Sequence, residues 1–451
     1  MPTSLGDAMF STPEMTALFS GRALVERMLV FEASLARAQA RAGLIPSDAA
    51  EVIAVHCRVD RLDLPALFQE SAASATPAVP LVRMLTAVVP GGAARYVHWG
   101  ATSQDATDTA MMLQVREGLD LLGAGLLAAG DACAALASAH RRTLMAGRTF
   151  LQQAVPITFG LKAARWLAMI ARGITRLRAV REAAVTLQLG GSAGTLASLR
   201  AHGDQVASNL AAALGLPQPD LPWHAERDRI GEIAAALGLV AGAMAKIATD
   251  LVLLSQTEVG EISMAEAGRS SAMPHKRNPA QATMALAASR LASGAAATLL
   301  GGMAHEHERA AGALQAEWQA LPDLFRFTAG TVQWTAAALE HVDVHPERMR
   351  ANLEQTGGLV MAEALTYALA AELGRPEAFV VVDAVVERAA VGGISFREAA
   401  AADERVRAVI SPEQLDRVLD PAAYLGSADA FIDRALDAHR RLRSPDGAPA
   451  R

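Results

Sequence analysis

The sequence predicts an all-α protein in which a central bundle of long helices is flanked by two smaller helical domains. Three observations favour this fold class. Hydrophobic residues make up 52% of the chain but aromatic residues only 4%, and alanine is abundant throughout. β-Branched residues cluster nowhere at the period of a strand, which favours helices over sheets. Four stretches also show helical patterns about twice as long as an average globular helix, which is typical of a bundle.

The long helical patterns differ in how much polar surface they present. The first lacks proline and is apolar enough to be buried on most sides, although its glycines favour an interruption. The second carries Lys162, Arg165 and Arg172 on a partly polar face. All four are expected as helices of the central bundle, over residues 117–144, 156–187, 230–256 and 280–303.

Breaks in the helical pattern indicate how the chain is divided. A stretch with several prolines and glycines over residues 76–92 predicts the approach to a first boundary. After Gly357 the helical patterns become shorter and are interrupted more often, which predicts a small C-terminal domain. At 451 residues the chain is long enough for two or three domains. We therefore expect domains at residues 1–108, 109–356 and 357–451.

Charge and cysteine content exclude several classes of site. The formal net charge of -6 argues against non-specific nucleic-acid binding, which needs a basic surface, yet a local basic pocket can still receive an anionic substrate. Cys57 and Cys133 are the only cysteines, and the chain has no CxxC motif and no Cys/His cluster. We therefore expect no disulfide framework and no structural zinc. We also expect no other metal and no cofactor.

The expected localisation is the cytoplasm. The N-terminal segment has no basic region followed by an apolar core, so it does not resemble a secretory signal. Residues 119–138 and 233–254 are apolar enough to be considered as membrane spans. Charged residues interrupt both stretches, so neither provides the ~20 uninterrupted apolar residues that a spanning helix needs. These residues are Asp120 and Asp131 in the first stretch, and Lys246 and Asp250 in the second.

The segment GRSSAMPHKRNP, at residues 268–279, is the most specific motif in the chain. Adjacent serines, a preceding glycine and two prolines are unfavourable inside a helix, so they predict a loop that can move. A helix is expected to begin near Pro279. Lys276 and Arg277 come just before it, where free backbone N–H groups also favour anions. The loop therefore predicts a carboxylate site beside two hydroxyls, and the alternative is a helix-capping loop with solvated charges.

The same segment closely resembles the signature loop of the fumarase/aspartase superfamily, with which it shares the pattern SSxMPxKxNP. The resemblance implies that the first serine, Ser270, is the general base, and that Lys276 and Asn278 hold a substrate carboxylate. A free hydroxyl has far too high a pKa to accept a proton at neutral pH. The alkoxide therefore needs nearby cations and backbone N–H groups, with water excluded. The chemistry implied is acid–base catalysis at a bond β to a carboxylate, without a metal.

The segment HWGATSQDATDT, at residues 98–109, is a second match to the superfamily. The resemblance implies that this region binds a substrate carboxylate, with Thr102 and Ser103 as small hydrogen-bond donors. Without the resemblance, Thr102 to Asp105 is better interpreted as a capping box at a helix start. His98 matches a histidine that some lyases place at the active site. We expect it to be catalytic, as an acid or a hydrogen-bond donor, although a lone histidine is more often structural.

The segment GRTFLQQAVPITFG, at residues 147–160, resembles a third superfamily segment but departs from it at one position. Thr149 and Gln152 fit the pattern and are expected to contact the substrate. Phe150 stands where adenylosuccinate and argininosuccinate lyases carry a catalytic histidine, and phenylalanine can neither donate nor accept a proton. The alternative for this segment is a loop leading into a helix, with Phe150 packed in a core.

The segment LGGSAGT, at residues 189–195, is a fourth and weaker match. It fails as a dinucleotide-binding loop because it lies between helices and follows no strand. The resemblance implies a loop near the active site, with Thr195 in contact with the substrate. Alternatively, its glycines serve only close backbone packing. The four matches occur in the order of the superfamily, which makes chance agreement very improbable.

Phe150 favours one branch of the superfamily, the 3-carboxy-cis,cis-muconate cycloisomerases of protocatechuate degradation in the β-ketoadipate pathway. Lyases that expel an amine or hydroxide benefit from an acid that protonates the leaving group. A cycloisomerase joins a substrate carboxylate to a conjugated double bond to form a carboxymuconolactone. In reverse this carboxylate leaves as a stable anion, so a dedicated acid is less necessary. The segments at residues 98–111 and 308–322, the second with Glu317 and Trp318, also resemble this branch.

Two alternatives stay open. One is adenylosuccinate lyase or another lyase of the superfamily, and the other is a catalytically silent structural protein on the same scaffold, against which the intact signature loop argues. The resemblance also implies a homotetramer whose active sites are each built from several subunits. Long apolar helices fit this expectation, because a monomer would expose too much of them. The expected partner is a small polycarboxylate substrate, with no nucleic acid and no membrane.

Overall fold

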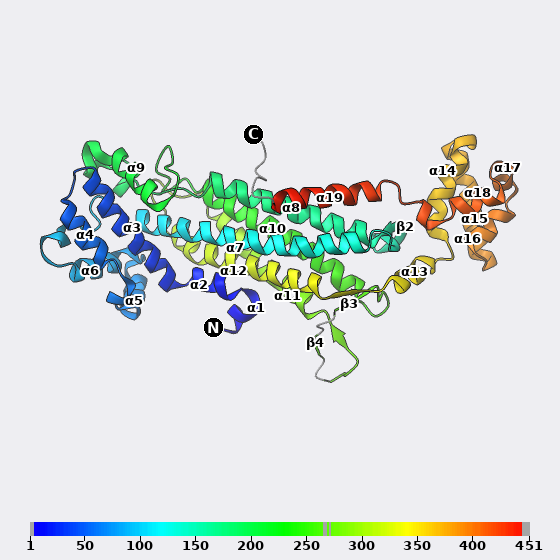
Figure 1. The fold of residues 1–451 in the computed structure, drawn as a ribbon, viewed down its shortest axis with the longest axis horizontal. Helices are drawn as coiled ribbons and strands as arrows, with labels where there is room; N and C mark the ends of the chain where they lie inside the picture. The colour runs from blue at the N-terminus through cyan, green and yellow to red at the C-terminus, as the bar shows by residue number, and fades with distance from the viewer. Residues whose placement is uncertain (1–3, 265–267, 270–271, 444–451) are drawn as a thin grey trace. The chain divides into compact units, whose positions relative to one another are not determined.

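The computed structural model describes residues 4–264, 268–269 and 272–443 (Figure 1). The chain is 73% helical. Strands in the described residues form three two-stranded antiparallel sheets. The predicted all-α fold class is therefore confirmed.

Five long helices dominate the fold. Four of them correspond to the four long patterns of the sequence, although the first helix begins well before residue 117. The fifth helix, which the sequence did not indicate as long, continues through Pro322. These helices are α7 (Ser103–Ala139), α8 (Phe159–Ala183), α10 (Asp228–Leu254), α11 (Ala280–Gly301) and α12 (Ala313–Glu340).

The chain forms two compact units, and each of the five long helices contributes residues to both. The first unit comprises Met1–Leu126, Gly173–Lys246 and Met284–Trp334. The second comprises Leu127–Arg172, Ile247–Thr283 and Thr335–Arg451. The three-domain division expected from the sequence is not tested by these units and stays a prediction.

Shorter helices complete the first unit, and several begin at side-chain caps. Ser20 accepts a hydrogen bond from the backbone of Ala23, and Asp63 accepts one from Ala66, because free N–H groups at a helix start need acceptors. The helices are α1 (Leu5–Phe10), α2 (Pro13–Leu18), α3 (Gly21–Arg41), α4 (Ser47–His56), α5 (Leu64–Ser74), α6 (Ala78–Val88) and α9 (Gly203–Leu214). Helix α3 packs against α4 and α9 (Figure 1).

Glycine and alanine let the long helices of the first unit approach closely. Gly118 of α7 faces Phe325 of α12, and a Cβ atom there would lie 2.8 Å from the ring. Phe325 also stacks on Phe19, with ring centroids 4.7 Å apart. Gly238 of α10 faces Ala296 of α11, and a Cβ atom there would be in van der Waals contact, 3.6 Å from the alanine Cβ. The alanine-rich composition is therefore explained by close helix packing, which favours small side chains at the contacts.

The second unit has its own core among short C-terminal helices. Leu365, Val385 and Phe396 are buried at its centre. Ser395 and Ser411 each form a capping box at the start of a helix. The elements are α13 (Pro346–Glu354), α14 (Ala362–Leu373), α15 (Arg375–Gly392), α16 (Phe396–Ala402), α17 (Glu404–Val409), α18 (Pro412–Val418) and α19 (Ala428–Arg443), with strands β1 (Leu144–Thr149), β2 (Gln152–Thr158), β3 (Ile262–Met264), β4 (Gly268–Arg269), β5 (Arg277–Asn278) and β6 (Val342–Val344).

Three helices, α7, α10 and α11, are long and apolar enough to cross a membrane when judged by length and composition alone. The first two contain the apolar stretches that charged residues interrupt, and the sequence did not single out the third. Gly238 and Ala296 show that α10 and α11 also pack closely on each other.

Candidate active site

The signature loop is enclosed by a short antiparallel pairing of β4 and β5, in which Gly268 pairs with Asn278 and Arg269 with Arg277. Lys276 is exposed and Asn278 partly buried, and α11 begins at Ala280, as the sequence predicts. The general base predicted from the resemblance, Ser270, lies outside the described residues. Lys276 is one of only three lysines in the chain, which otherwise uses arginine as its cation.

The second predicted segment lies at the start of α7 in the first unit. Thr102 and Ser103 are partly buried there. The backbone N–H of Thr102 donates to Asp105 Oδ2 at 2.9 Å, which is one of the two bonds of the capping box expected from the sequence. His98 precedes this helix, and its Nδ1 atom lies 2.6 Å from Oε1 of the buried Glu32.

Asp105 joins the second predicted segment to the fourth. Its carboxylate is fully buried and accepts hydrogen bonds from the backbone N–H groups of Gly190 and Gly191, each at 2.9 Å. The ring of His224 contacts the same carboxylate through Nε2 at 2.7 Å. These bonds hold the LGGSAGT loop against the start of α7, and Thr195 is exposed on that loop. Its glycines do serve close packing, because a Cβ atom on Gly191 would lie 3.1 Å from the carbonyl oxygen of Gly100.

A buried ionic network follows one turn further along α7. Arg227 forms a bidentate ion pair with Asp108, at 2.8 Å and 3.1 Å, and contacts Glu317 of α12 through Nε and Nη2. Its guanidinium also lies over the ring of Trp223, 4.9 Å from the centroid. Burial disfavours the charged guanidinium, but the two carboxylates outweigh burial and raise the pKa of Arg227. Glu317, which the sequence analysis named for its resemblance to one branch of the superfamily, thus has a defined partner.

Gln104 and Arg309 extend the network to the LGGSAGT loop. Gln104 donates to Asp108 at 3.0 Å and accepts from Arg309 Nε at 3.1 Å. Arg309 also donates to the carbonyl oxygen of Ser192 at 3.2 Å. Beside it, the buried ring of His305 lies 3.3 Å from Glu317, and burial lowers the pKa of His305 despite that carboxylate. The segments at residues 98–109, 189–195 and 308–322 therefore meet in one polar core of the first unit.

The third predicted segment is a β-hairpin, not a loop leading into a helix. Thr149 and Gln152 pair at its end and are both exposed, and Phe150 and Leu151 form the two-residue turn. Phe150 is 100% exposed, so the alternative that it packs in a core is wrong. Both turn residues have positive φ, 49° and 64°, which is typical of type I′ hairpin turns that usually contain Asn-Gly.

A buried ion pair connects this hairpin to the chain that leads into the signature loop. Arg148 of β1 donates to both carboxylate oxygens of Glu261, at 3.0 Å and 2.5 Å, and Glu261 is fully buried. Asn352 of α13 donates to the same carboxylate at 2.9 Å. Glu261 directly precedes β3, which fixes one end of the segment that continues into the signature loop.

The predicted site residues fall into two groups. His98, Thr102, Ser103 and Thr195 lie in the first unit, while Thr149, Gln152, Lys276 and Asn278 lie in the second. Sequence analysis missed four residues with central contacts, Glu32, His224, Arg227 and Arg309. The segment WHAER, just before α10, was the available signal for two of them, because it gathers an aromatic, an imidazole and a guanidinium within five positions.

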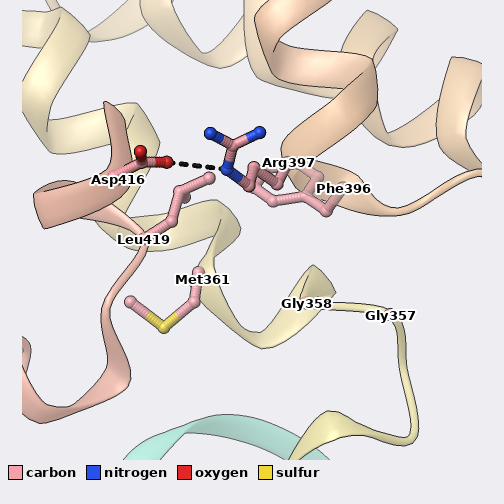
Figure 2. A pocket seen from close by; sticks show the side chains of 7 residues that line it. All are labelled: Gly357, Gly358, Met361, Phe396, Arg397, Asp416 and Leu419. Atoms are coloured by element: carbon pink, nitrogen blue, oxygen red, sulfur yellow. Dashed lines mark hydrogen bonds and ion pairs between the residues drawn. The ribbon is translucent and has the colours of Figure 1, made fainter. Parts of the chain in front are cut away.

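The described residues contain no group of three or more His, Cys, Asp or Glu side chains that could hold a metal ion. A small pocket of about 160 Å³ lies among the C-terminal helices, where Arg397 and Asp416 form an ion pair at 2.6 Å (Figure 2). It contains none of the predicted site residues. This ion pair is largely exposed, so it contributes little to stability.

Comparison with known proteins shows matches to two families of lyases, and the first match includes the four predicted segments at residues 98–279. The family described as "Lyase" matches residues 6–294, and the family described as "Adenylosuccinate lyase C-terminus" matches residues 358–435. A 3-carboxy-cis,cis-muconate cycloisomerase from Bradyrhizobium diazoefficiens is 46% identical, over 96% of this chain and 97% of the relative. A nitrosuccinate lyase from Streptomyces davaonensis is 42% identical, over 93% of this chain and 91% of the relative.

A solved structure is similar over almost the whole length. The crystal structure of 3-carboxy-cis,cis-muconate lactonizing enzyme from Pseudomonas putida has a TM-score of 0.90 and 42% identity, and the match covers 98% of this chain and 100% of that one. The match of the lyase family covers more than half of the chain and includes the signature loop. The chain therefore belongs to the fumarase/aspartase superfamily of lyases.

Proposed function

We propose that this enzyme is a 3-carboxy-cis,cis-muconate cycloisomerase, which interconverts 3-carboxy-cis,cis-muconate and a carboxymuconolactone in protocatechuate degradation. The observation that carries this function is the 46% identity, across nearly the whole of both chains, to a relative of that name. Phe150 supports it, because a reaction whose leaving group is a stable carboxylate does not need the acid that the resemblance places at this position.

The proposed reaction uses the carboxylates of the substrate, Ser270 as acid and base, and the side chains of Lys276 and Asn278 as partners of the carboxylates. One substrate carboxylate forms a C–O bond to a carbon of the conjugated diene, and the electron pair of that double bond moves toward a second carboxylate. Ser270 returns a proton to the carbon next to this second carboxylate; in reverse it abstracts that proton. Lys276 and Asn278 of the signature loop hold carboxylates and stabilise the enediolate-like intermediate.

The remaining predicted residues complete the proposed carboxylate site. Thr102 and Ser103 stand at the start of α7, where the free N–H groups of a long helix also favour an anion. Thr149, Gln152 and Thr195 are exposed, so each side chain is free to contact a substrate. His98 is proposed to be catalytic, as an acid or a hydrogen-bond donor.

An ultraviolet assay with 3-carboxy-cis,cis-muconate tests the function, because ring closure removes the absorbance of the diene. Ser270→Ala is expected to abolish turnover without changing the thermal unfolding midpoint. Ser271→Ala, the matched change at the neighbouring serine, should retain most of the activity. Normal turnover by Ser270→Ala, or no turnover of the muconate by the parent enzyme, would contradict the proposal.

The second candidate function is a lyase that breaks a C–N bond β to a carboxylate. The 42% identity to a nitrosuccinate lyase favours it. Nitrosuccinate and adenylosuccinate assayed in parallel distinguish the two candidates. Formation of fumarate from either substrate, without loss of the muconate diene, would establish a lyase instead and would remove the argument from Phe150.

The proposed assembly is a cytoplasmic homotetramer that binds no nucleic acid. The exposed hairpin tip supports an association of copies, because Phe150 is 100% and Leu151 73% exposed, and apolar tips of this kind favour a covered position. The three long apolar helices are proposed to face other helices in the assembly and not lipid. Sedimentation velocity of the purified enzyme tests the tetramer, and fractionation of cells tests the localisation.

A further inference from the structure

Helix α3 carries two buried polar side chains on one face, and both contact the segment that contains His98. Glu32 and Gln39 are seven positions apart, so they lie two helical turns from each other on the same side. Glu32 Oε1 lies 2.6 Å from His98 Nδ1, and Gln39 Nε2 donates to the carbonyl oxygen of Trp99 at 2.5 Å. The helix therefore fixes both the ring of His98 and the backbone that follows it.

The carboxylate of Glu32 is poorly satisfied for a buried charge. Its contact with His98 is the one hydrogen bond that it makes among the described residues, and Oε2 has no partner there. By contrast, the buried carboxylate of Asp105 accepts three backbone N–H groups and contacts a histidine. A structural carboxylate is normally satisfied in the manner of Asp105, because an unpaired buried charge is costly. Glu32 is thus better explained by what it does to His98.

The backbone and ring of His98 are both held in a defined state. Its φ of 55° lies in the left-handed region, which non-glycine residues rarely adopt and which clusters at functional sites. Since a carboxylate accepts from Nδ1–H, the proton on Nδ1 is fixed and Nε2 is the nitrogen directed to a ligand. The side chain is 14% exposed, so a ligand can reach it.

The charges around His98 favour its protonated form. Burial by itself lowers the pKa of the ring, but the charge and the hydrogen bond of Glu32 outweigh burial, and Asp105 of α7 adds to them, so the pKa of His98 is raised. Cys57, at the end of α4, also lies near Glu32, and burial raises the pKa of its thiol, which keeps it neutral. The two charges that act on His98, Glu32 of α3 and Asp105 of α7, are therefore both negative, and Asp105 is shared with the ring of His224.

We propose that Glu32 is a positioning residue that holds His98 as an imidazolium with its Nε2–H presented to a substrate carboxylate. This proposal rests on the proposed function in requiring a polycarboxylate substrate. Lys276 is a flexible cation, whereas His98 is a cation whose direction is fixed by a second residue. The pair of Glu32 and His98 suits the substrate carboxylate whose negative charge increases during the reaction, because the imidazolium donor is already oriented before that charge appears.

The dependence of activity on pH tests the pair through three variants. Glu32→Gln removes the charge at nearly constant shape, and Glu32→Asp keeps the charge but shortens the side chain. Glu26→Gln is the matched control, since it removes a carboxylate from the same helix whose partner is the exposed Arg22. The enzyme with protonated His98 is the active form, so activity falls as pH rises through the pKa of His98.

Glu32→Gln is expected to move this basic limb of the profile to lower pH and to reduce kcat about tenfold or more at alkaline pH, by analogy with the carboxylates that orient metal-bound histidines. The two enzymes should converge at acidic pH, where His98 is protonated in both. Glu32→Asp should restore part of the loss, and Glu26→Gln should match the parent. A profile of Glu32→Gln that coincides with the parent profile would overturn the proposal.

A second measurement does not depend on activity. Hydrogen–deuterium exchange at the imidazole C2 position, followed by mass spectrometry of peptides, reports the titration of each of the 11 histidines. His98 should titrate at a lower pH in Glu32→Gln than in the parent, because the raising effect of the Glu32 charge is lost. An unchanged titration of His98 overturns the proposal even if activity falls. If the parent does not act on the muconate but His98 shifts as expected, the proposed function fails and the pairing of Glu32 with His98 stands. If Glu32→Gln does not fold, Glu32→Asp provides the same two comparisons.

Discussion

The guanidinium of Arg227 forms a two-point ion pair with the carboxylate of Asp108, and both side chains are fully buried. The two residues are far apart in sequence, one before α10 and the other in the first turns of α7. Glu317 of α12 contacts the remaining edge of the same guanidinium. One cation that directly precedes α10 thus joins α7 and α12, near the predicted carboxylate site at the start of α7.

Arg227→Met should strongly destabilise the first unit, because it leaves two buried carboxylates without a cation. We expect a loss of about 3–5 kcal/mol in the free energy of unfolding, the usual cost of breaking one side of a buried pair. Chemical denaturation followed by circular dichroism measures it. Arg350→Met is the control, since its pair with Glu354 is exposed, and it should change stability by less than about 0.5 kcal/mol. Equal effects of both variants would contradict this account.

Gly330→Ala should displace the N-terminal segment from α12. A Cβ atom at Gly330 would lie 2.3 Å from the carbonyl oxygen of Phe10, a contact that rigid backbone cannot relieve. We expect a loss of about 1–3 kcal/mol and faster proteolysis near α1. Gly294 is exposed and lies in the middle of α11, and no atom of the chain lies within 4 Å of the place of a Cβ there. Gly294→Ala should instead raise the free energy of unfolding by about 0.5–1 kcal/mol. Thermal unfolding compares the two, and a similar sign for both would refute the prediction.

Asp403 should make the C-terminal helices sensitive to acid. The hydrogen bond from Arg405 holds the pKa of the Asp403 carboxyl below its ordinary value, with burial opposing and the backbone N–H of Arg405 assisting. A depressed pKa in the folded state means that the stabilisation is present above the unfolded pKa, about 3.9, and is lost as pH falls through the folded pKa. Asp403→Asn keeps a capping side chain at α17 but removes its charge, and should cost about 0.3–1 kcal/mol at neutral pH.

The difference between Asp403→Asn and the parent should narrow as pH is lowered from about 5 toward 3. Hydrogen exchange of peptides that cover α16 and α17 measures this local stability at each pH. Asp416→Asn is the control, because its ion pair with Arg397 is exposed, and it should leave the protection of these peptides unchanged. A difference that stays constant with pH would show that the charge of Asp403 is not the cause.

Replacing the hairpin tip by Asn-Gly should separate folding from assembly. The double change Phe150→Asn and Leu151→Gly provides the residues that a type I′ turn prefers and relieves about 1–3 kcal/mol of backbone strain per strained position. We expect an equal or higher unfolding midpoint for the chain but weaker association in sedimentation velocity. Leu221→Asn, which removes a leucine that is 75% exposed elsewhere, should not alter association. If the double variant assembles as tightly as the parent, the tip takes no part in the interface.

The sequence predicted the helices where apolar periodicity is continuous and failed where polar residues are buried. The expected helix at residues 230–256 appears as α10, Asp228–Leu254. The start of α7 at Ser103 agrees with the capping box that the sequence indicates at Thr102 to Asp105. The sequence did not indicate that Gln104, Asp105 and Asp108 are buried, because their partners are distant in the sequence. No local pattern can show that such a carboxylate has a buried arginine beside it.

The hairpin shows a second limit of sequence reasoning. Phe150 and Leu151 lack the glycine or asparagine that normally indicates a two-residue turn, so nothing in the pattern predicts positive φ there. The signature loop was the opposite case. Its prolines and serines predicted both a loop and the helix start at Ala280, because those residue types act locally. The contact between Glu32 and His98 is separated by 66 positions and could be found only in the structure.

The five long helices that belong to both units have a consequence for how this chain can be made and divided. A boundary between the units cuts every one of these helices part of the way along its length. Neither unit can then be produced as a separate fragment without exposing broken helix ends and the apolar faces beside them. Unfolding of one unit should propagate along the shared helices into the other. The whole polypeptide is therefore expected to behave as one cooperative folding element, and truncated versions are expected to aggregate during expression.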